Sequence, residues 1–268
     1  MIGSGLGLAV TCGSERLQSR RSARALREVS AVLLYLHPVS SNCHKVLMAF
    51  YERGVPFETE IVDMFDVEQN TAYRREINPI GKIPALRTDE GDVLPESTLI
   101  IEYAEQRFPD LPRLIPEDPH GALEARRWDR FVDLYLNATF SKILQDNLRP
   151  EGTQDSFGVA EARRRLGRSY AILDAHLADR QWLAGNAFTM ADCAAAPSLH
   201  LGQRALSHEG FPNLQAYYER VCGRPTWQRV WNDNLPWREK VGVDLKAMRA
   251  AMGWDEATLA EDAESAPA

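Results

Sequence analysis

Short apolar runs and amphipathic segments alternate through the first third of the chain. Residues 31–36, AVLLYL, are apolar throughout and predict a buried strand. From about Asn42 to Arg53, apolar residues recur at a spacing of three to four, which predicts a helix that Gly54 would end. The segments that follow are, in order, a strand in 56–62, a short helix in 67–78, strands in 83–88 and 92–96, and a helix in 97–108. The order β-α-β-α-β-β-α predicts an α/β domain over residues 31–109, with both parallel and antiparallel strand pairs.

Four prolines interrupt this pattern between residues 109 and 119, and the chain beyond them is helical in pattern. We interpret residues 110–120 as a linker between two domains. Residues 121–240 carry apolar residues at helical spacing and no convincing strand, which predicts an all-α helical bundle. The expected helices lie near 121–148, 156–179, 189–204, 213–222 and 226–231.

The two ends of the chain differ from the rest in composition. Residues 1–30 are Gly-rich and then Arg-rich, with little apolar material, and we expect a disordered extension there. Residues 241–268 lead into an acidic, Ala-rich segment, which predicts a C-terminal helix or a disordered tail.

The overall charge and the cysteines narrow the classes of function. The 268 residues carry a formal net charge of -7, and this acidic balance argues against nucleic-acid binding. The four cysteines are widely separated and form no CxxC pattern, so neither a zinc site nor a disulfide framework is predicted. No apolar stretch is long enough to span a membrane, and we expect a cytoplasmic protein without a metal.

The stretch HPVSSNC, residues 37–43, lies between the first strand and the first helix. Ser40 would stand at the mouth of that helix, where a hydroxyl can donate to a thiolate and the helix dipole adds to the stabilisation. Cys43 would be either a reactive thiol at the same helix end or a small buried packing residue. A nucleophilic serine activated by His37 or His44 is conceivable, but no Ser/His/Asp set is evident.

Two further stretches could bind a peptide-like ligand that has a free amino-acid end. In NPIGKIPAL, the Ile83–Pro84 bond would be either cis, aiming the backbone groups of Ile83 outward, or trans at a sheet edge. In LPESTLIIEY, Ser97 is a candidate N-cap whose helix end would bind a carboxylate. Glu96 beside it could accept from an ammonium group, and plain helix capping is the alternative.

In this order, the motifs resemble those of the cytosolic glutathione transferase superfamily. SSNC, GKIPAL and ESTLIIEYAEQRFP are similar to segments of its thioredoxin-like domain, and the helical part is similar to its C-terminal domain. WLAGNAFTMADCAAAP is similar to a structural signature of the family, in which Thr189 and Asp192 form a capping box, and GRPTWQRVW is similar to its final helix. The resemblance covers about residues 31–235 and implies a thioredoxin-like α/β domain followed by an all-α helical bundle domain.

The resemblance also implies roles for single residues. HPVS is similar to the HPAS of phi-class members, and Ser40 would be the catalytic serine of the serine-type classes, which also include theta and zeta. Cys43 does not occupy the position that cysteine-type classes use, which argues against a main thiol–disulfide activity. The residues expected to bind glutathione are Lys82 at the glycyl end, Ile83 and Pro84 at the cysteinyl part, Glu96 and Ser97 at the γ-glutamyl end, and Asn42 with His44 in the thiol pocket.

The second substrate would bind in the cleft between the domains. Candidates for this electrophile site are Trp128, Phe131, Tyr135 and Phe140, although an aromatic helix face is also typical of a core. The resemblance implies a homodimeric glutathione transferase, with glutathione as co-substrate, that activates the glutathione thiolate for attack on a small hydrophobic electrophile. The alternatives are a glutathione-dependent isomerase, dehalogenase or ether-cleaving enzyme on the same fold, and a non-catalytic glutathione-binding or regulatory protein.

Overall fold

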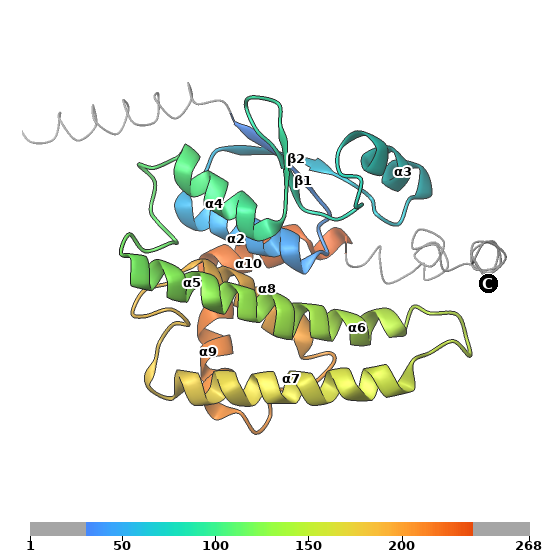
Figure 1. The fold of residues 1–268 in the computed structure, drawn as a ribbon, viewed down its shortest axis with the longest axis vertical. Coiled ribbons are helices and arrows are strands. Elements are labelled where there is room, and N and C mark those ends of the chain that lie inside the picture. The colour runs from blue at the N-terminus through green and yellow to red at the C-terminus, as the bar shows by residue number, and fades with distance from the viewer. Residues whose placement is uncertain (1–30, 238–268) are drawn as a thin grey trace, which may run out of the picture.

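The structure is a computed structural model that describes residues 31–237. Figure 1 shows a sheet-containing part above several layers of helices. The extension predicted at residues 1–30 and the tail predicted at 241–268 lie outside the described residues. Every helix within 31–237 is too short or too polar to cross a bilayer.

The sheet-containing part has the thioredoxin-like architecture that the sequence predicts. Within the described residues, its four strands form one mixed sheet in the order β2-β1-β3-β4. Strand β1 pairs in parallel with β2 and antiparallel with β3, which pairs antiparallel with β4. The elements are β1 (Val32–Leu36), α2 (Ser41–Arg53), β2 (Phe57–Ile61), α3 (Val67–Glu76), β3 (Ala85–Arg87), β4 (Val93–Pro95) and α4 (Ser97–Arg107).

Strand β1 is covered on both faces, as its apolar sequence predicts. Leu34 belongs to the large core cluster that contains residues of α2 and α4, which lie together against the sheet in Figure 1. Tyr35 points the other way and packs with Tyr73 of α3 in a smaller cluster. Successive side chains of a strand point to opposite faces, so a strand covered on both sides is apolar throughout. Helix α2 then ends at Gly54, whose φ of 73° suits glycine.

The remaining elements are helical, which confirms the predicted all-α part. The single helix expected over 121–148 is divided, because residues 132–137 form a π-helical segment between two α-helices. The elements are α5 (Pro119–Phe131), η1 (Val132–Asn137), α6 (Ala138–Asp146), α7 (Ser156–His176), η2 (Leu177–Asp179), α8 (Met190–Gly202), α9 (Pro212–Cys222) and α10 (Pro225–Asp233).

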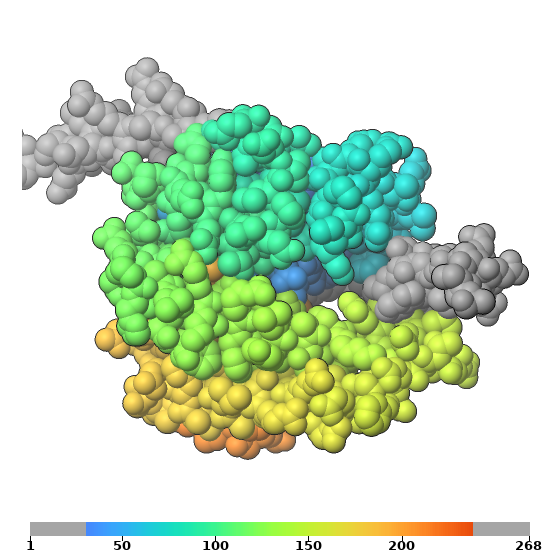
Figure 2. Space-filling model, viewed as in Figure 1, coloured from blue at the N-terminus to red at the C-terminus, as the bar shows by residue number. Residues whose placement is uncertain are grey.

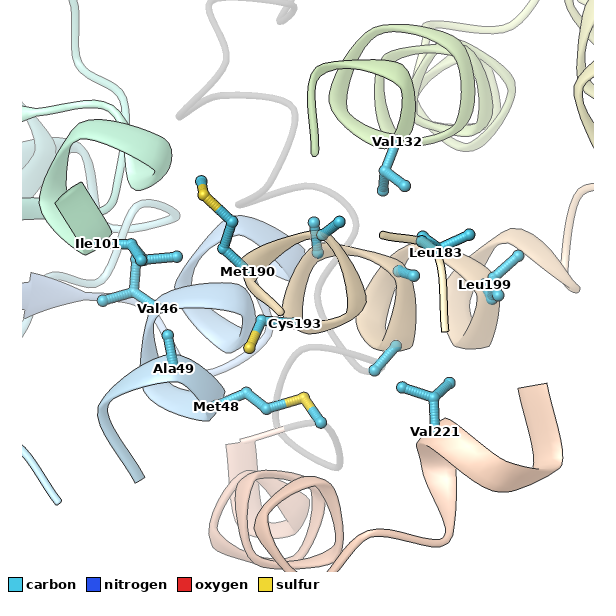
Figure 3. Packing of buried hydrophobic residues seen from close by; sticks show 14 of the residues in the cluster. Val46, Met48, Ala49, Ile101, Val132, Leu183, Met190, Cys193, Leu199 and Val221 are labelled. Carbon is cyan, nitrogen blue, oxygen red and sulfur yellow. The ribbon is translucent and has the colours of Figure 1, made fainter. Parts of the chain in front are cut away.

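Helix α8 lies at the centre and connects the two parts of the molecule. Figure 3 shows Cys193 of α8 beside Val46, Met48 and Ala49 of α2, and all four residues belong to one buried cluster. Alanines at 191 and 194–196 are buried, and their small side chains allow neighbouring helices to approach closely. The predicted capping box of Thr189 and Asp192 is present at the start of this helix.

Candidate functional site

A cleft of about 940 Å³ lies between the sheet-containing part and helices α5 and α6. In Figure 2 it appears as a hollow in which blue atoms, from near residue 40, lie between the cyan and green parts. The structure brings together in this cleft all seven residues that the sequence predicts for catalysis and glutathione binding. They are Ser40, Asn42, Lys82, Ile83, Pro84, Glu96 and Ser97.

Ser40 is the N-cap of α2, at the floor of the cleft. Its backbone is extended, with φ of -79° and ψ of 124°, and its Oγ accepts from the backbone N–H of Cys43 at 3.4 Å. As an acceptor in that bond, the hydroxyl keeps its own proton for donation. The adjacent Ser41 differs, because its Oγ donates to Oδ1 of Asn137 at 2.9 Å. Ser40 is therefore the hydroxyl suited to donate a hydrogen bond to an anion in the cleft. The positive end of the α2 dipole lies at the same place and would also stabilise the anion.

Cys43 has the properties of a packing residue. Its side chain is fully buried in the core that joins α2 to α8. Burial raises the pKa of the Cys43 thiol to about 12, although hydrogen bonding by Ser40 and by the backbone of His37 opposes the rise. A thiol in this state is not ionised at neutral pH, so the structure supports the packing interpretation over the reactive one.

The two histidines near Ser40 are directed elsewhere. His44 is fully buried, and its Nε2 lies 2.6 Å from the carbonyl oxygen of Pro38. His37 lies with its Nε2 3.8 Å from a carboxylate oxygen of Asp63. The cleft lining includes neither histidine, so the expectation that His44 lines a thiol pocket is wrong.

The segment before β3 lines the cleft with Lys82, Ile83 and Pro84. The Ile83–Pro84 bond is cis. The hydroxyl of Tyr73 and the side-chain amide of Asn78 both donate to the carbonyl oxygen of Lys82 at 2.8 Å. These two bonds fix the backbone at Lys82, while its side chain is exposed at the cleft.

The beginning of α4 differs from the prediction by one residue. Glu96, not Ser97, occupies the N-cap position, and it adopts a φ of 76° without a side-chain capping bond. Ser97 is the first helical residue and is 7% exposed. The turn from β4 into α4 requires the left-handed conformation at the cap, which Glu96 adopts at a conformational cost. Both residues still line the cleft, where the N–H groups of the first turn of α4 can bind a carboxylate.

A buried charged cluster beside this helix end was not predicted. Lys45 of α2 lies with its Nζ 2.7 Å from Asp129 and 2.9 Å from Asp133, and it donates to Oγ1 of Thr98 at 2.9 Å. Both Lys45 and Asp129 are almost completely buried, and desolvation raises the pKa of the Asp129 carboxyl. The cluster joins α2 and α4 to α5 and η1. The signal in the sequence was a lysine within the apolar pattern of α2, because a buried lysine needs a carboxylate partner.

Three of the four aromatic candidates for the electrophile site do not line the cleft, which corrects that prediction. Trp128 stacks at 4.0 Å on the ring of His176 in α7, and the carbonyl of Tyr135 accepts from Ser169 of the same helix. Phe131 contacts these two aromatic side chains. A helix advances about 100° per residue, so this set lies on the face that packs toward α7. The helix face that lines the cleft carries Arg130, Asp133, Leu134, Asn137, Ala138, Phe140, Ser141, Leu144 and Gln145.

The cleft is mixed in chemistry. Cationic groups of Arg74, Lys82 and Arg130 line it, together with the carboxylates of Glu96 and Asp133. Residues 31–237 contain no group of three or more His, Cys, Asp or Glu side chains placed to hold a metal ion. The arrangement can bind a ligand with both carboxylate and ammonium groups, beside a serine hydroxyl at a helix N-terminus.

Family models match both parts of the chain. The model for the N-terminal domain of glutathione S-transferases matches residues 39–107. The model for their C-terminal domain matches residues 131–225. The matched segments include the first turns of α2 and α4 and the helix face that lines the cleft from Asp133 onward.

Individual proteins are similar to the chain across both parts. Glutathione S-transferase GstB of Escherichia coli strain K12 is 30% identical over 195 residues, covering 71% of this chain and 93% of the relative. Maleylacetoacetate isomerase of Pseudomonas aeruginosa is 24% identical, covering 76% of this chain and 97% of the relative. A crystal structure of a glutathione S-transferase from Methylobacillus flagellatus with GSH bound has a TM-score of 0.68 and 26% identity, covering 75% of this chain and 98% of that one.

Proposed function

Because this chain belongs to the glutathione S-transferase family, we propose that it is a glutathione transferase in which the Ser40 hydroxyl stabilises the glutathione thiolate. The observation that carries the proposal is the position of Ser40. Its Oγ lines the cleft at the N-terminus of α2 and is already an acceptor for Cys43 N–H, so that its proton is available for a sulfur atom.

The remaining cleft residues suit the two ends of glutathione. The N–H groups at the start of α4, with Ser97, bind the γ-glutamyl carboxylate, and Glu96 accepts from the neighbouring ammonium group. The backbone of Ile83 pairs with the cysteinyl part, beside the cis bond to Pro84. The Lys82 side chain binds the glycyl carboxylate. Asn42, two residues after Ser40 in the first turn of α2, lies at the thiol pocket.

The gain from this arrangement is a higher thiolate concentration at neutral pH. A free thiol with a pKa near 8.5 is only a few per cent ionised at pH 7. Lowering that pKa by about two units corresponds to about 2.7 kcal/mol, which is within reach of a charge-assisted hydrogen bond together with a helix dipole. The bound thiolate then attacks the electrophilic carbon, and the leaving group departs with the bonding electron pair.

The second substrate is a small hydrophobic electrophile. Support for this comes from the apolar side chains that line the cleft, among them Phe140, Leu144 and Leu201. We further propose that the protein is cytoplasmic and works as a homodimer, as its family relationship suggests.

Two alternatives use the same cleft. A glutathione-dependent isomerase would share the thiolate and differ in the second substrate, and the similarity to the isomerase of Pseudomonas aeruginosa favours it as the second candidate. A dehalogenase or ether-cleaving enzyme would differ in the same way. A non-catalytic glutathione-binding or regulatory protein would bind the tripeptide without lowering the pKa of its thiol.

The test is a titration of the bound thiol by ultraviolet difference absorbance, in the parent and in Ser40→Ala. We expect a thiol pKa about two units below that of free glutathione in the parent, and a return toward the free value in the variant. Ser207→Ala, in the loop between α8 and α9, is the matched control and should titrate like the parent. An equally low pKa in Ser40→Ala would contradict the proposal, and bound glutathione without a lowered pKa in the parent would support the non-catalytic alternative.

A further inference from the structure

The side chain of Asn137 joins the helical part to the segment that carries Ser40. Its Oδ1 accepts from the hydroxyl of Ser41 at 2.9 Å, and its Nδ2 donates to Oδ1 of Asn42 at 2.6 Å. Asn137 is 7% exposed, and both bonds are partly buried. Both polar atoms of one side chain are thus bound to the two residues that directly follow Ser40.

The local bond at Ser40 is weaker than these two. The bond that its Oγ accepts from Cys43 N–H is 3.4 Å long and lies near the limit for a hydrogen bond. A hydroxyl held by one long bond can rotate and shift within its N-cap. Fixing the following two residues from the opposite wall of the cleft limits the shift, because the Ser40 backbone must move with them.

The π-helical segment η1 is the feature that lets Asn137 reach across. Asp129, Asp133 and Asn137 are four residues apart, and all three contact the sheet-containing part. In a regular α-helix, each step of four residues turns the side chain about 40° further around the axis, since each residue advances about 100°. Over two steps the third residue would turn away from the interface. The wider turn of a π-helix rotates less per residue, and Asn137 is the last residue of that turn.

We propose that Asn137 is a positioning residue for the thiolate chemistry, which holds residues 40–42 so that the Ser40 hydroxyl is directed at the glutathione sulfur. The inference rests on the proposed role of Ser40 and adds a contribution of the second domain to it. Asn137 touches neither glutathione nor the reacting atoms in this scheme. Its effect passes through Ser41 and Asn42 to the orientation of one hydroxyl.

The test repeats the thiol titration with Asn137→Ala and with Ser41→Ala, which removes only one of the two bonds. We expect the pKa of bound glutathione to rise by about one unit in Asn137→Ala, equivalent to about a tenfold loss of thiolate at a pH below both values. Ser41→Ala should give a smaller rise. The KM for glutathione should change little, because the groups that bind the two ends of the tripeptide are untouched. Asn147→Ala, at the exposed end of α6, is the control.

A double-mutant cycle separates positioning from a general loss of structure. In the Ser40→Ala background, Asn137→Ala should raise the thiol pKa no further, because the hydroxyl that it orients is gone. Additive effects would overturn the inference, and so would an unchanged pKa in both Asn137→Ala and Ser41→Ala. If Asn137→Ala does not fold, Ser41→Ala alone decides the matter by the same two criteria. Failure of the proposed function is distinguishable, since Ser40→Ala itself would then leave the pKa unchanged.

Discussion

Ser40, Ser41 and Cys43 lie within four residues and are suited to different tasks because of their surroundings. Ser40 faces the cleft with a hydroxyl proton to donate, whereas the proton of Ser41 is bound by Asn137. Cys43 faces the core, where burial raises the pKa of its thiol to about 12. Chemistry at this site is therefore decided by which side of the first turn of α2 a residue occupies.

Cys43→Ala should leave catalysis intact. Burial raises the pKa of the Cys43 thiol to about 12, so the thiol stays protonated at pH 7 and contributes no nucleophile. The variant is expected to keep kcat/KM within about twofold of the parent and to lose about 1–2 kcal/mol of unfolding free energy through the small cavity. Both quantities can be measured by steady-state kinetics and urea unfolding. The control Cys222→Ala also removes a buried free thiol. A loss of the thiolate signal in Cys43→Ala, but not in Cys222→Ala, would show that Cys43 takes part.

The residues that line the cleft could be predicted from the sequence where their signal is local. Ser40 before a helical pattern, Pro84 at a strand and Glu96 beside a helix start are each recognisable from a few neighbouring residues. Asn137 gave no such signal, because its partners Ser41 and Asn42 are 96 and 95 residues away in the chain. The face of α5 that carries Trp128 was assigned to the cleft for a related reason. Periodicity identifies which residues share a helix face, but it does not say what that face contacts.

Among the helices, α8 is the one whose first residue is most clearly predicted from the sequence. The capping box needs only Thr189 and an acid three residues later, and both contacts are local. The division of the helix expected over 121–148 could not be predicted, because one wider turn leaves the apolar spacing nearly unchanged. Asp192 also accepts two hydrogen bonds from residues outside the capping box. It is fully buried and accepts from the N–H of Leu183 at 3.0 Å and from the hydroxyl of Tyr217 at 2.6 Å.

Asp192→Asn should destabilise the protein strongly although it preserves shape. The Oδ1 atom accepts from Leu183 and Tyr217, and Oδ2 accepts from the backbone and hydroxyl of Thr189. An amide in either orientation turns an NH₂ group toward two of these donors. With each buried donor left unpaired at about 1–3 kcal/mol, we expect a loss of about 2–4 kcal/mol in urea unfolding. The exposed Asp179→Asn should change stability by less than about 0.5 kcal/mol, and equal losses in the two variants would refute this account.

At the scale of the whole molecule, two kinds of contact hold the parts together. Small and apolar residues of α8 pack on α2, as Figure 3 shows around Cys193 and Val46. The cluster of Lys45 with Asp129, Asp133 and Thr98 adds charged contacts between α2, α4 and the helical part. The cleft opens between the same elements, so the relative position of its two walls depends on both kinds of contact.

Lys45→Met tests the contribution of the charged cluster. The substitution keeps an unbranched side chain but leaves Asp129 buried without its cation, and breaking a buried pair in this way typically costs about 3–5 kcal/mol. Lys142→Met is the control, because Nζ of Lys142 lies 2.7 Å from Asp155, the same distance as between Lys45 and Asp129. The side chains of Lys142 and Asp155 are each 39% exposed. An exposed pair contributes at most about 1 kcal/mol, since water and salt screen it.

Urea unfolding of the two variants compares the buried cluster of Lys45 with an exposed ion pair of the same closest distance. We expect Lys45→Met to unfold at much lower urea concentration than the parent, and Lys142→Met to differ little from it. Replacing Asp129 by Asn in the Lys45→Met background removes the stranded charge, so it should recover part of the loss. Equal stability of Lys45→Met and Lys142→Met would mean that apolar packing between α2 and α8 alone holds the walls of the cleft together.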